Sequence, residues 1–315
     1  MAAECDMKGL FRMYDIIVVG AGPAGLTAAL YARRAEKSVL VIEKDTFGGQ
    51  ITHSPRVENY PGYLEMSGNE FADKLIEQVM AQGAEIDLDA VVGIKGAPGN
   101  YTVVCEGGSR EAKSVIIATG SHHRMLGLKD EEKYTGEGIS YCAVCDGAFY
   151  RGKIVAVIGG GNSALQDAVL LSESCERVYV VQNLPYLTGE SRLQSILAER
   201  DNVEIICSSV VESIVDNGGF GGIVISTDGA RRTLAVDGMF VAIGQVPENE
   251  PFASVTTLND YGYIVSDESC VPAGAADGIF VAGDCRTKAV RQVTTATADG
   301  AVAALAACRF IDGLK

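Results

Sequence analysis

Two closely spaced cysteines, Cys142 and Cys145, are the residues of this 315-residue chain whose types and spacing best suit chemistry. A Cys-x-x-Cys spacing brings two sulfurs within disulfide reach, and a neighbouring donor can stabilise one of them as a thiolate. The alternative is half of a structural zinc site, which needs two further Cys or His ligands. The chain has three histidines, His53, His122 and His123, and no second close cysteine pair. The pair therefore predicts dithiol–disulfide chemistry and no metal.

The other cysteines are isolated in the sequence, and an odd total of nine in a long chain is not typical of a secreted disulfide scaffold. A buried cysteine usually serves as a small apolar side chain. We expect this role for most of Cys5, Cys105, Cys175, Cys207, Cys270, Cys285 and Cys308.

Composition and charge exclude several classes of partner. The balance of 47% hydrophobic and 21% charged residues is that of a globular protein. A net charge of −15 argues against nucleic acid, because phosphate binding requires concentrated Lys and Arg. Apolar runs such as 16–19 and 39–42 have the length of strands rather than of membrane spans, and the leader 1–13 lacks the apolar stretch of a secretory signal. We expect a cytoplasmic enzyme.

A dinucleotide-binding pattern opens the chain. Its parts are a strand, a G-x-G-x-x-G turn, an apolar helix, a second strand and a final carboxylate, at residues 14–19, 20–25, 26–35, 38–42 and Glu43. The glycines allow a tight turn and a close approach of the backbone to a pyrophosphate at the helix N-terminus. The carboxylate is placed to accept hydrogen bonds from a ribose.

The same pattern occurs a second time. A strand at 154–158 leads into Gly159-Gly160-Gly161-Asn162-Ser163-Ala164, a helix at 165–172 and a strand at 177–181. Alanine at the third glycine position is an accepted variant. Two such units predict two dinucleotide-type domains.

The segments that flank the second pattern indicate how the domains are connected. Residues 115–120 and 239–244 have the pattern of strands that run into glycine turns, and we interpret them as crossings between the domains. A strand at 279–282 and a helix at 295–310 return the chain to the first domain. We predict an α/β fold with two Rossmann-like domains of the three-layer ββα type, 1–120 with 246–315, and 121–245 inserted between them.

From residue 14 onward the chain resembles the low-molecular-weight thioredoxin reductases. The residues that carry the resemblance are 20–25, Gly48-Gly49-Gln50, Val57-Glu58-Asn59-Tyr60-Pro61-Gly62, Ala118-Thr119-Gly120, 142–147, Gly283-Asp284 and 291–300. In that family these segments surround FAD. The resemblance implies FAD binding by Gly20, Gly22, Pro23, Ala24, Gly25, Glu43, Gly49, Gln50, Asn59, Ala118, Thr119, Gly120, Gly283, Asp284, Arg291, Gln292 and Val293.

The resemblance also implies roles for the cysteine pair. In the family the second cysteine, here Cys145, lies against the flavin and receives its electrons, and the first, Cys142, attacks the disulfide of thioredoxin. Asp146 fits the family's acid, which protonates the departing thiolate. The alternative is that Asp146 only forms an Asp-Gly turn or caps a helix. Because the pair lies in the inserted domain, we expect that domain to swing between flavin and partner.

The second fingerprint departs from the family pattern at the end of its second strand. Gln182 lies 23 residues after Gly159, as Glu43 lies 23 residues after Gly20. NADPH-dependent relatives carry His-Arg-Arg-x-x-x-Arg from this position, whereas residues 182–188 here are Gln-Asn-Leu-Pro-Tyr-Leu-Thr. Each charge-assisted partner of a ribose phosphate is worth on the order of 1.5–3 kcal/mol. We therefore predict that NADPH is not the ordinary electron donor.

A smaller set of thioredoxin-reductase-like flavoproteins lacks these arginines and takes electrons from reduced ferredoxin. The chain is similar to them, because it keeps the glycines and the cysteine pair while losing the pocket. We therefore predict a ferredoxin-linked thioredoxin reductase. Ferredoxins are generally acidic and this chain carries −15 itself, so docking requires a local basic patch. The candidates are Arg33, Arg34, Arg286, Lys288 and Arg291.

Three alternatives stay open. NADH or NADPH could be the donor if Gln182 bonds a ribose and Arg192 compensates in part. A flavin-binding interaction protein with a degenerate second domain is a different class, and the cysteine pair argues against it. A ferredoxin–NADP oxidoreductase on the same scaffold needs no cysteine pair and requires an intact nucleotide pocket. The resemblance implies a homodimer.

Overall fold

The first strand shows why this chain builds layers on both faces of a sheet. The computed structural model describes residues 12–54 and 56–314. In β1 (Met13–Val19), Ile16 and Val18 pack into one apolar cluster, while Ile17 and Val19 pack into another. Successive side chains of a strand point to opposite faces of the sheet. A strand that is apolar throughout therefore has to be covered on both sides.

The chain divides into two compact units, and the second interrupts the first. The first unit consists of Met1–His122 and Val246–Lys315, and the second of His123–Gln245. The segments 115–120 and 239–244, which we interpreted as crossings, instead contribute the ends of β6 and β15 to the sheets of their own units. The chain crosses at β7 (His122–His123) and β16 (Gln245–Val246), which pair with each other.

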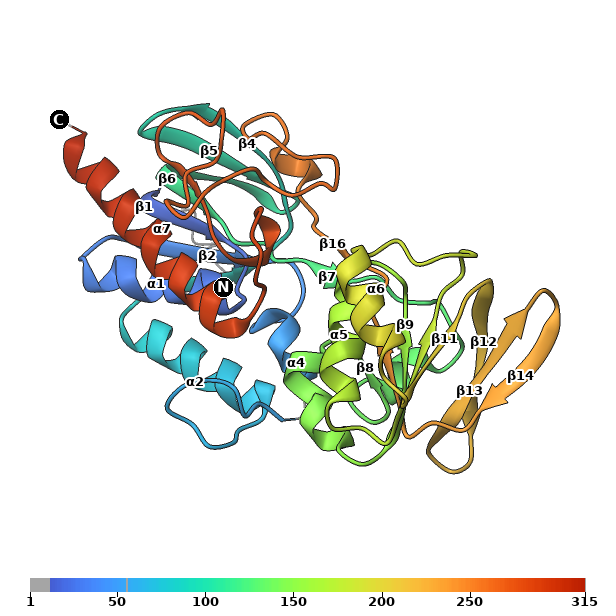
Figure 1. Ribbon diagram of the computed structural model, residues 1–315. Helices are drawn as coiled ribbons and strands as arrows, with labels where there is room; N and C mark the ends of the chain where they lie inside the picture. Colours follow the sequence, from blue (N-terminus) through green and yellow to red (C-terminus); the bar gives the residue numbers. More distant parts are fainter. Residues whose placement is uncertain (1–11, 55, 315) are drawn as a thin grey trace. The chain divides into compact units, whose positions relative to one another are not determined.

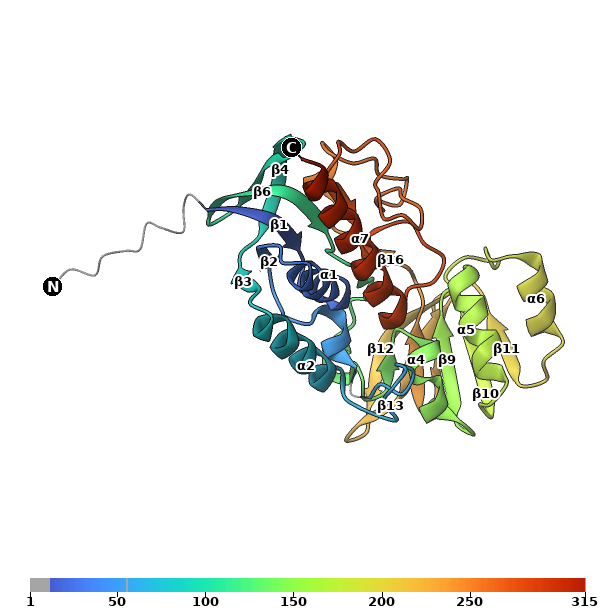
Figure 2. The ribbon, with the colours of Figure 1, turned by 90° about the vertical axis from the view of Figure 1, so that its left-hand side faces the viewer.

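The sheet of the first unit has the order β3-β2-β1-β6-β5-β4, and β17 also pairs with β6. The elements of this unit that follow β1 are α1 (Pro23–Arg34), β2 (Val39–Glu43), η2 (Gly49–His53), α2 (Gly68–Ala81), β3 (Glu85–Leu88), β4 (Val91–Ala97), β5 (Asn100–Cys105), β6 (Gly108–Ile117), η4 (Glu250–Phe252), β17 (Ile279–Val281), η5 (Gly283–Cys285) and α7 (Val293–Gly313). Figures 1 and 2 show α1 and α7 side by side against the sheet.

Strand β6 joins the two parts of that sheet. Its first residues pair antiparallel with β5, whereas its last residues pair parallel with β1 and β17. The carboxyl ends of β1, β2, β6 and β17 therefore lie along one edge of the sheet. In doubly wound folds this edge is where a dinucleotide binds.

The second unit repeats the plan. Its parallel sheet has the order β11-β10-β9-β15-β8, and β12, β13 and β14 form a separate antiparallel sheet. Its elements are α3 (Glu131–Tyr134), β8 (Ile139–Ser140), α4 (Ala143–Asp146), η3 (Gly147–Tyr150), β9 (Ile154–Ile158), α5 (Asn162–Ser172), β10 (Arg177–Val181), α6 (Ser191–Ala198), β11 (Val203–Ile206), β12 (Ser209–Asp216), β13 (Phe220–Thr227), β14 (Ala230–Leu234) and β15 (Gly238–Val241). Side chains of α5 cover one face of the parallel sheet, and side chains of β13 and β14 cover the other.

The predicted α/β fold with two Rossmann-like domains is confirmed, and the differences concern element ends. Helix α1 begins at Pro23 rather than residue 26, because Gly22 caps it and proline suits the first helical position. Helix α5 likewise begins at Asn162. None of the helices within 12–54 and 56–314 combines the length and apolar character needed to cross a membrane.

Candidate functional site

The first glycine turn of the chain is built so tightly that its glycines cannot be replaced without strain. Gly20 has φ +108°, and a Cβ there would lie 2.3 Å from the carbonyl oxygen of Ala118. A Cβ on Gly25 would lie 1.9 Å from the oxygen of Gly20. These contacts hold α1, which starts at Pro23 and Ala24, against the end of β6.

Glu43 ends β2 beside this turn. Its Oε2 accepts a hydrogen bond from Ala21 N at 2.7 Å, and its Oε1 accepts one from Asp45 N at 3.0 Å. The carboxylate is half-buried and lines a cavity of about 190 Å³ together with Gly20 and Thr119. The two backbone bonds fix the orientation of the carboxylate, and the cavity leaves room for a ligand beside it.

The loop that follows β2 and contains Gly48 and Gly49 packs against the same glycine turn. Gly48 N donates to Ala21 O at 2.9 Å, and a Cβ on Gly49 would lie 3.1 Å from Gly22 Cα. Gln50 follows in η2 and is exposed. The structure therefore places Gly49 against the glycine turn.

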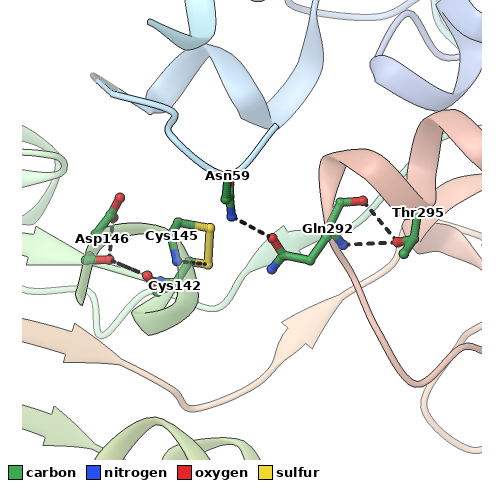
Figure 3. Close-up of a disulfide and its surroundings, with 7 residues drawn as sticks. Asn59, Cys142, Cys145, Asp146, Gln292 and Thr295 are labelled. Carbon is green, nitrogen blue, oxygen red and sulfur yellow. Dashed lines mark hydrogen bonds between the residues drawn. A yellow bond between two sulfur atoms is a disulfide. The ribbon is translucent and has the colours of Figure 1, made fainter. Parts of the chain in front are cut away.

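Asn59 and Gln292 are brought together although they lie far apart in the sequence. Asn59 Nδ2 donates to Gln292 Oε1 at 3.2 Å (Figure 3). Gln292 also caps α7, in a capping box with Thr295, and Val293 begins the helix and packs against an apolar cluster around Phe71. These contacts join the 57–62 loop to the start of α7.

Asp284 lies in η5 after the last strand of the sheet and carries an unsatisfied buried oxygen. Its Oδ1 is buried and has no hydrogen-bond partner. Burial raises the pKa of the Asp284 carboxyl, and the cations Lys288 and Arg291 oppose that rise. The guanidinium of Arg291 lies over the ring of Tyr263, at 4.2 Å from its centroid, and Arg291 Nε donates to Asp284 O at 3.4 Å. The free acceptor suits a hydroxyl donor from a ligand.

Cys142 and Cys145 form a disulfide with a Cα–Cα distance of 5.3 Å (Figure 3). Cys142 caps α4, and its sulfur accepts a hydrogen bond from Cys145 N at 3.2 Å. A thiolate formed at Cys142 would keep this donor, because charge strengthens a hydrogen bond to its acceptor. The disulfide therefore has a hydrogen-bond donor directed at its first sulfur.

Asp146 lies beside the pair and is held by Ser140. Ser140 Oγ donates to Asp146 Oδ2 at 2.6 Å and accepts from Cys142 N at 3.1 Å. Burial raises the pKa of the Asp146 carboxyl, and the Ser140 hydrogen bond opposes the rise in part. Its Oδ1 is buried without a partner. A carboxyl whose pKa is raised is a candidate general acid for a neighbouring thiolate.

The second glycine turn copies the backbone geometry of the first. Gly159 has φ +130°, and a Cβ there would lie 2.5 Å from Ala242 O. The equivalent of Glu43 is Gln182, which is 5% exposed. A Cβ on Gly160 would lie 2.6 Å from Gln182 Cδ, so the amide packs directly on the turn.

The polar atoms of Gln182 are occupied by their own loop. Its Oε1 accepts from Asn183 N at 3.2 Å, and its Nε2 donates to Tyr186 O at 3.4 Å. Thr188 N donates to Gly160 O at 2.8 Å. Residues 182–189 contain no cation, and Arg192 lies exposed on α6.

The prediction of a basic docking patch is wrong for two of its five candidate residues, Arg286 and Lys288. Arg286 is 1% exposed, and the side chain of Lys288 is 5% exposed, because both bind the buried carboxylate of Asp299. Arg33 donates to the carbonyls of Gln82 and Lys37, and Arg34 is exposed on α1. Arg286 and Lys288 cannot contact a protein partner from these positions.

Two residues of the site were not found from the sequence. Ser140 joins the Asp146 carboxyl to Cys142, and its position two residues before that cysteine was the available signal. Asn249 is fully buried, accepts from Thr119 Oγ1 at 3.2 Å and donates to Cys285 O at 2.8 Å. Nothing local in the sequence marks Asn249, because its partners lie far along the chain.

Most of the isolated cysteines among the described residues are buried, as predicted. The structure buries Cys105, Cys175, Cys270, Cys285 and Cys308 and leaves Cys207 half-buried. Cys5 and most of the leader 1–13 lie outside the described residues. Burial raises the pKa of the Cys105 and Cys285 thiols to about 11, which suits inert apolar roles.

Two dinucleotide-type units in one chain, with a Cys-x-x-Cys disulfide in the second, are typical of the disulfide oxidoreductases. The comparisons with known proteins agree: residues 14–300 match the family model of the pyridine nucleotide-disulphide oxidoreductases, and the chain belongs to that family.

Relatives of the chain within the family are similar over nearly its whole length. It is 39% identical over 307 residues to the thioredoxin reductase of Listeria monocytogenes serovar 1/2a, covering 96% of each chain. It is 40% identical over 305 residues to a "34.2 kDa protein in rubredoxin operon" of Clostridium pasteurianum, covering 96% and 98%. Among solved structures, the thioredoxin reductase of Streptococcus pyogenes superposes with a TM-score of 0.91 at 38% identity, covering 96% and 99%.

Proposed function

We propose that this protein is a thioredoxin reductase that binds FAD and reduces the disulfide of a thioredoxin through Cys142 and Cys145. The observation that carries the proposal is the Cys142–Cys145 disulfide, with the half-buried carboxyl of Asp146 held beside it by Ser140. The relatives that bear the name thioredoxin reductase support the choice of substrate.

The residues of the first unit fit FAD, which the family implies. The turn at Gly20 leaves no room for a side chain, so a pyrophosphate can approach the backbone there. The carboxylate of Glu43 is anchored beside a cavity, where it can accept hydrogen bonds from a ribose. The buried Oδ1 of Asp284 lacks a donor, which a hydroxyl of the bound group would supply.

Bound FAD would supply the two electrons that reduce the Cys142–Cys145 disulfide. The thiolate of Cys142 then attacks one sulfur of the thioredoxin disulfide, and the other sulfur of that disulfide leaves as a thiolate. Asp146 protonates this leaving thiolate. The thiolate of Cys145 next attacks the sulfur of Cys142, which releases the second thioredoxin sulfur and restores the Cys142–Cys145 disulfide.

For the electron donor we propose reduced ferredoxin in place of NADPH. In the second unit the residue equivalent to Glu43 is an uncharged amide whose polar atoms bond its own loop. Residues 182–189 offer no cation to a ribose phosphate. A dianionic phosphate in a partly desolvated site requires such partners.

A trapping experiment tests the proposed substrate. In Cys145→Ser the resolving thiol is missing, so a mixed disulfide between Cys142 and thioredoxin should accumulate and be visible on a non-reducing gel. The matched control is Cys142→Ser, which should trap nothing. If Cys142→Ser trapped thioredoxin and Cys145→Ser did not, the assigned roles would be reversed.

A donor assay tests the ferredoxin proposal and its rival. Reduced ferredoxin, NADPH and NADH are mixed anaerobically with the FAD-loaded chain, and the flavin absorbance is followed by stopped flow. We expect rapid bleaching by ferredoxin only. Rapid bleaching by micromolar NADPH or NADH would instead establish a nucleotide-dependent thioredoxin reductase.

A further inference from the structure

A cluster of charged residues is buried behind the Gly283–Asp284 turn. Asp299, on α7, accepts from Arg286 in a bidentate pair, Nε to Oδ2 and Nη2 to Oδ1, both at 2.8 Å. Lys288 Nζ donates to Asp299 Oδ2 at 2.9 Å. Burial opposes ionisation of Asp299, but the bonds from Arg286 and Lys288 hold the pKa of its carboxyl below the usual value.

The fourth donor to this carboxylate belongs to the turn itself. Gly283 N donates to Asp299 Oδ2 at 3.0 Å, and both groups are buried. Gly283 has φ +82°, and a Cβ there would lie 2.8 Å from the Cβ of Ala24 at the start of α1. The carboxylate therefore fixes a left-handed backbone position that only glycine adopts without strain and that directly precedes Asp284.

The cost of this cluster indicates a role beyond stability. Removing three charged groups from water is costly, and well-packed apolar residues often replace buried ion pairs without loss of stability. Glu268, which also faces Arg286 at 3.6 Å, is exposed. An apolar cluster could fill the same space, but it could not accept the hydrogen bond of Gly283 N.

We propose that Asp299 is a positioning residue for the flavin: it holds Gly283 N, and thereby the Asp284 carboxyl, where the bound group requires them. Arg286 and Lys288 keep Asp299 ionised in its buried position. This inference rests on the proposed function, because it assumes that FAD binds at the Asp284 turn.

The test compares two carboxylates of the first unit that both bind a backbone N–H and a cation. Asp299→Asn removes the charge next to Gly283. The matched control is Asp15→Asn: Asp15, on β1, accepts from Ser38 N at 2.8 Å and from Lys113 Nζ at 2.7 Å. The full-length chain is stripped of FAD and titrated with FAD, and the dissociation constant is taken from flavin fluorescence.

We expect Asp299→Asn to raise the FAD dissociation constant roughly tenfold to a hundredfold, the effect of one charge-assisted hydrogen bond. We expect Asp15→Asn to leave it within about twofold. A wild-type dissociation constant in Asp299→Asn, or an equal rise in Asp15→Asn, would overturn the inference. A wild-type chain that binds no FAD would instead overturn the proposed function.

A second variant serves if Asp299→Asn does not fold. Asp299→Glu keeps the charge that Arg286 and Lys288 require but moves the carboxylate by one methylene relative to Gly283. We expect a folded chain, with an unfolding temperature near that of the wild type and weaker FAD binding. Wild-type FAD binding in Asp299→Glu would count against the inference as directly as in Asp299→Asn.

Discussion

The two glycine turns of this chain share a backbone. Gly20 and Gly159 adopt φ of +108° and +130°. A Cβ on either glycine would clash with a carbonyl oxygen at the end of a neighbouring strand, that of Ala118 or Ala242. The strand–turn–helix geometry is the same in both units because the same close approach requires glycine in both. The glycines therefore indicate the geometry of the turn, and they do not indicate which ligand binds there.

The side chains that follow differ in chemistry. Glu43 presents an anchored carboxylate to a cavity. Gln182, at the equivalent strand end, packs on Gly160, and both of its side-chain polar atoms form hydrogen bonds with residues of its own loop. The comparison teaches that the same dinucleotide fold accepts either a carboxylate or an amide at the end of its second strand, because the fold depends on the glycines and the apolar core.

The largest effect is expected where the second unit differs most from the first, at the disulfide. Cys142→Ser combined with Cys145→Ser should abolish thioredoxin reduction, a loss of several orders of magnitude, because the nucleophile and the resolving thiol are both gone. FAD content, measured by absorbance, should stay at the wild-type level. Retained reduction would mean that the second unit does not carry the chemistry.

The acid beside the disulfide should give the next largest effect. Asp146→Asn should lower the rate of thioredoxin reduction about 10²-fold or more, as loss of a general acid does. Because burial raises the pKa of Asp146, the wild-type rate should fall as pH rises through that raised value. The Asn variant should lack this dependence in a pH–rate profile. An unchanged rate would leave Asp146 with only a turn-forming role.

The same carboxyl predicts the sign of a stability change. The folded chain binds the Asp146 proton more tightly than the unfolded chain does, because its pKa is raised on folding. The free energy of unfolding should therefore fall as pH rises from the usual carboxyl pKa to the raised one. Denaturant titrations of wild type and Asp146→Asn across this interval check the sign, and the two curves should converge at lower pH.

Introducing cations after Gln182 would give the second unit charged partners for the ribose phosphate of NADPH. Asn183→Arg with Leu184→Arg and Thr188→Arg should raise kcat/KM for NADPH about a hundredfold, since each charge-assisted bond is worth on the order of 1.5–3 kcal/mol and the bonds are not additive. The control carries Gln at the same three positions and should gain nothing. Equal gains in both variants would point to opening of the loop rather than to charge.

Making the first unit resemble the second gives the smallest expected effect. Glu43→Gln keeps the shape of the side chain but loses the charge, so the FAD dissociation constant should rise about tenfold. Gln182→Asn, the control in the second unit, should leave FAD binding unchanged. An FAD affinity that did not respond to Glu43→Gln would remove the ribose contact assigned to that carboxylate.

Local patterns predicted much of the fold but little of the arrangement around the site. The strands of both βαβ units were placed within one or two residues, since apolar runs and glycine turns act through near neighbours in the chain. The strands β3 to β5 and β12 to β14 were not placed, because their side chains gain burial only once the parallel sheets exist. The pairing of Asn59 with Gln292 also depends on segments that only folding brings together.

The sequence by itself determined the two glycine turns, the Cys142–Cys145 pair and the absence of arginines from residues 183–188, because each depends on residue type at short spacing. Only the tertiary structure decided that Gln182 lies buried on Gly160 and that Ser140 holds Asp146. It also turned Arg286 and Lys288 from candidate surface charges into partners of a buried carboxylate. These features depend on burial and on contacts between residues far apart in the chain. The type of a residue does not determine which other residues surround it in the folded protein.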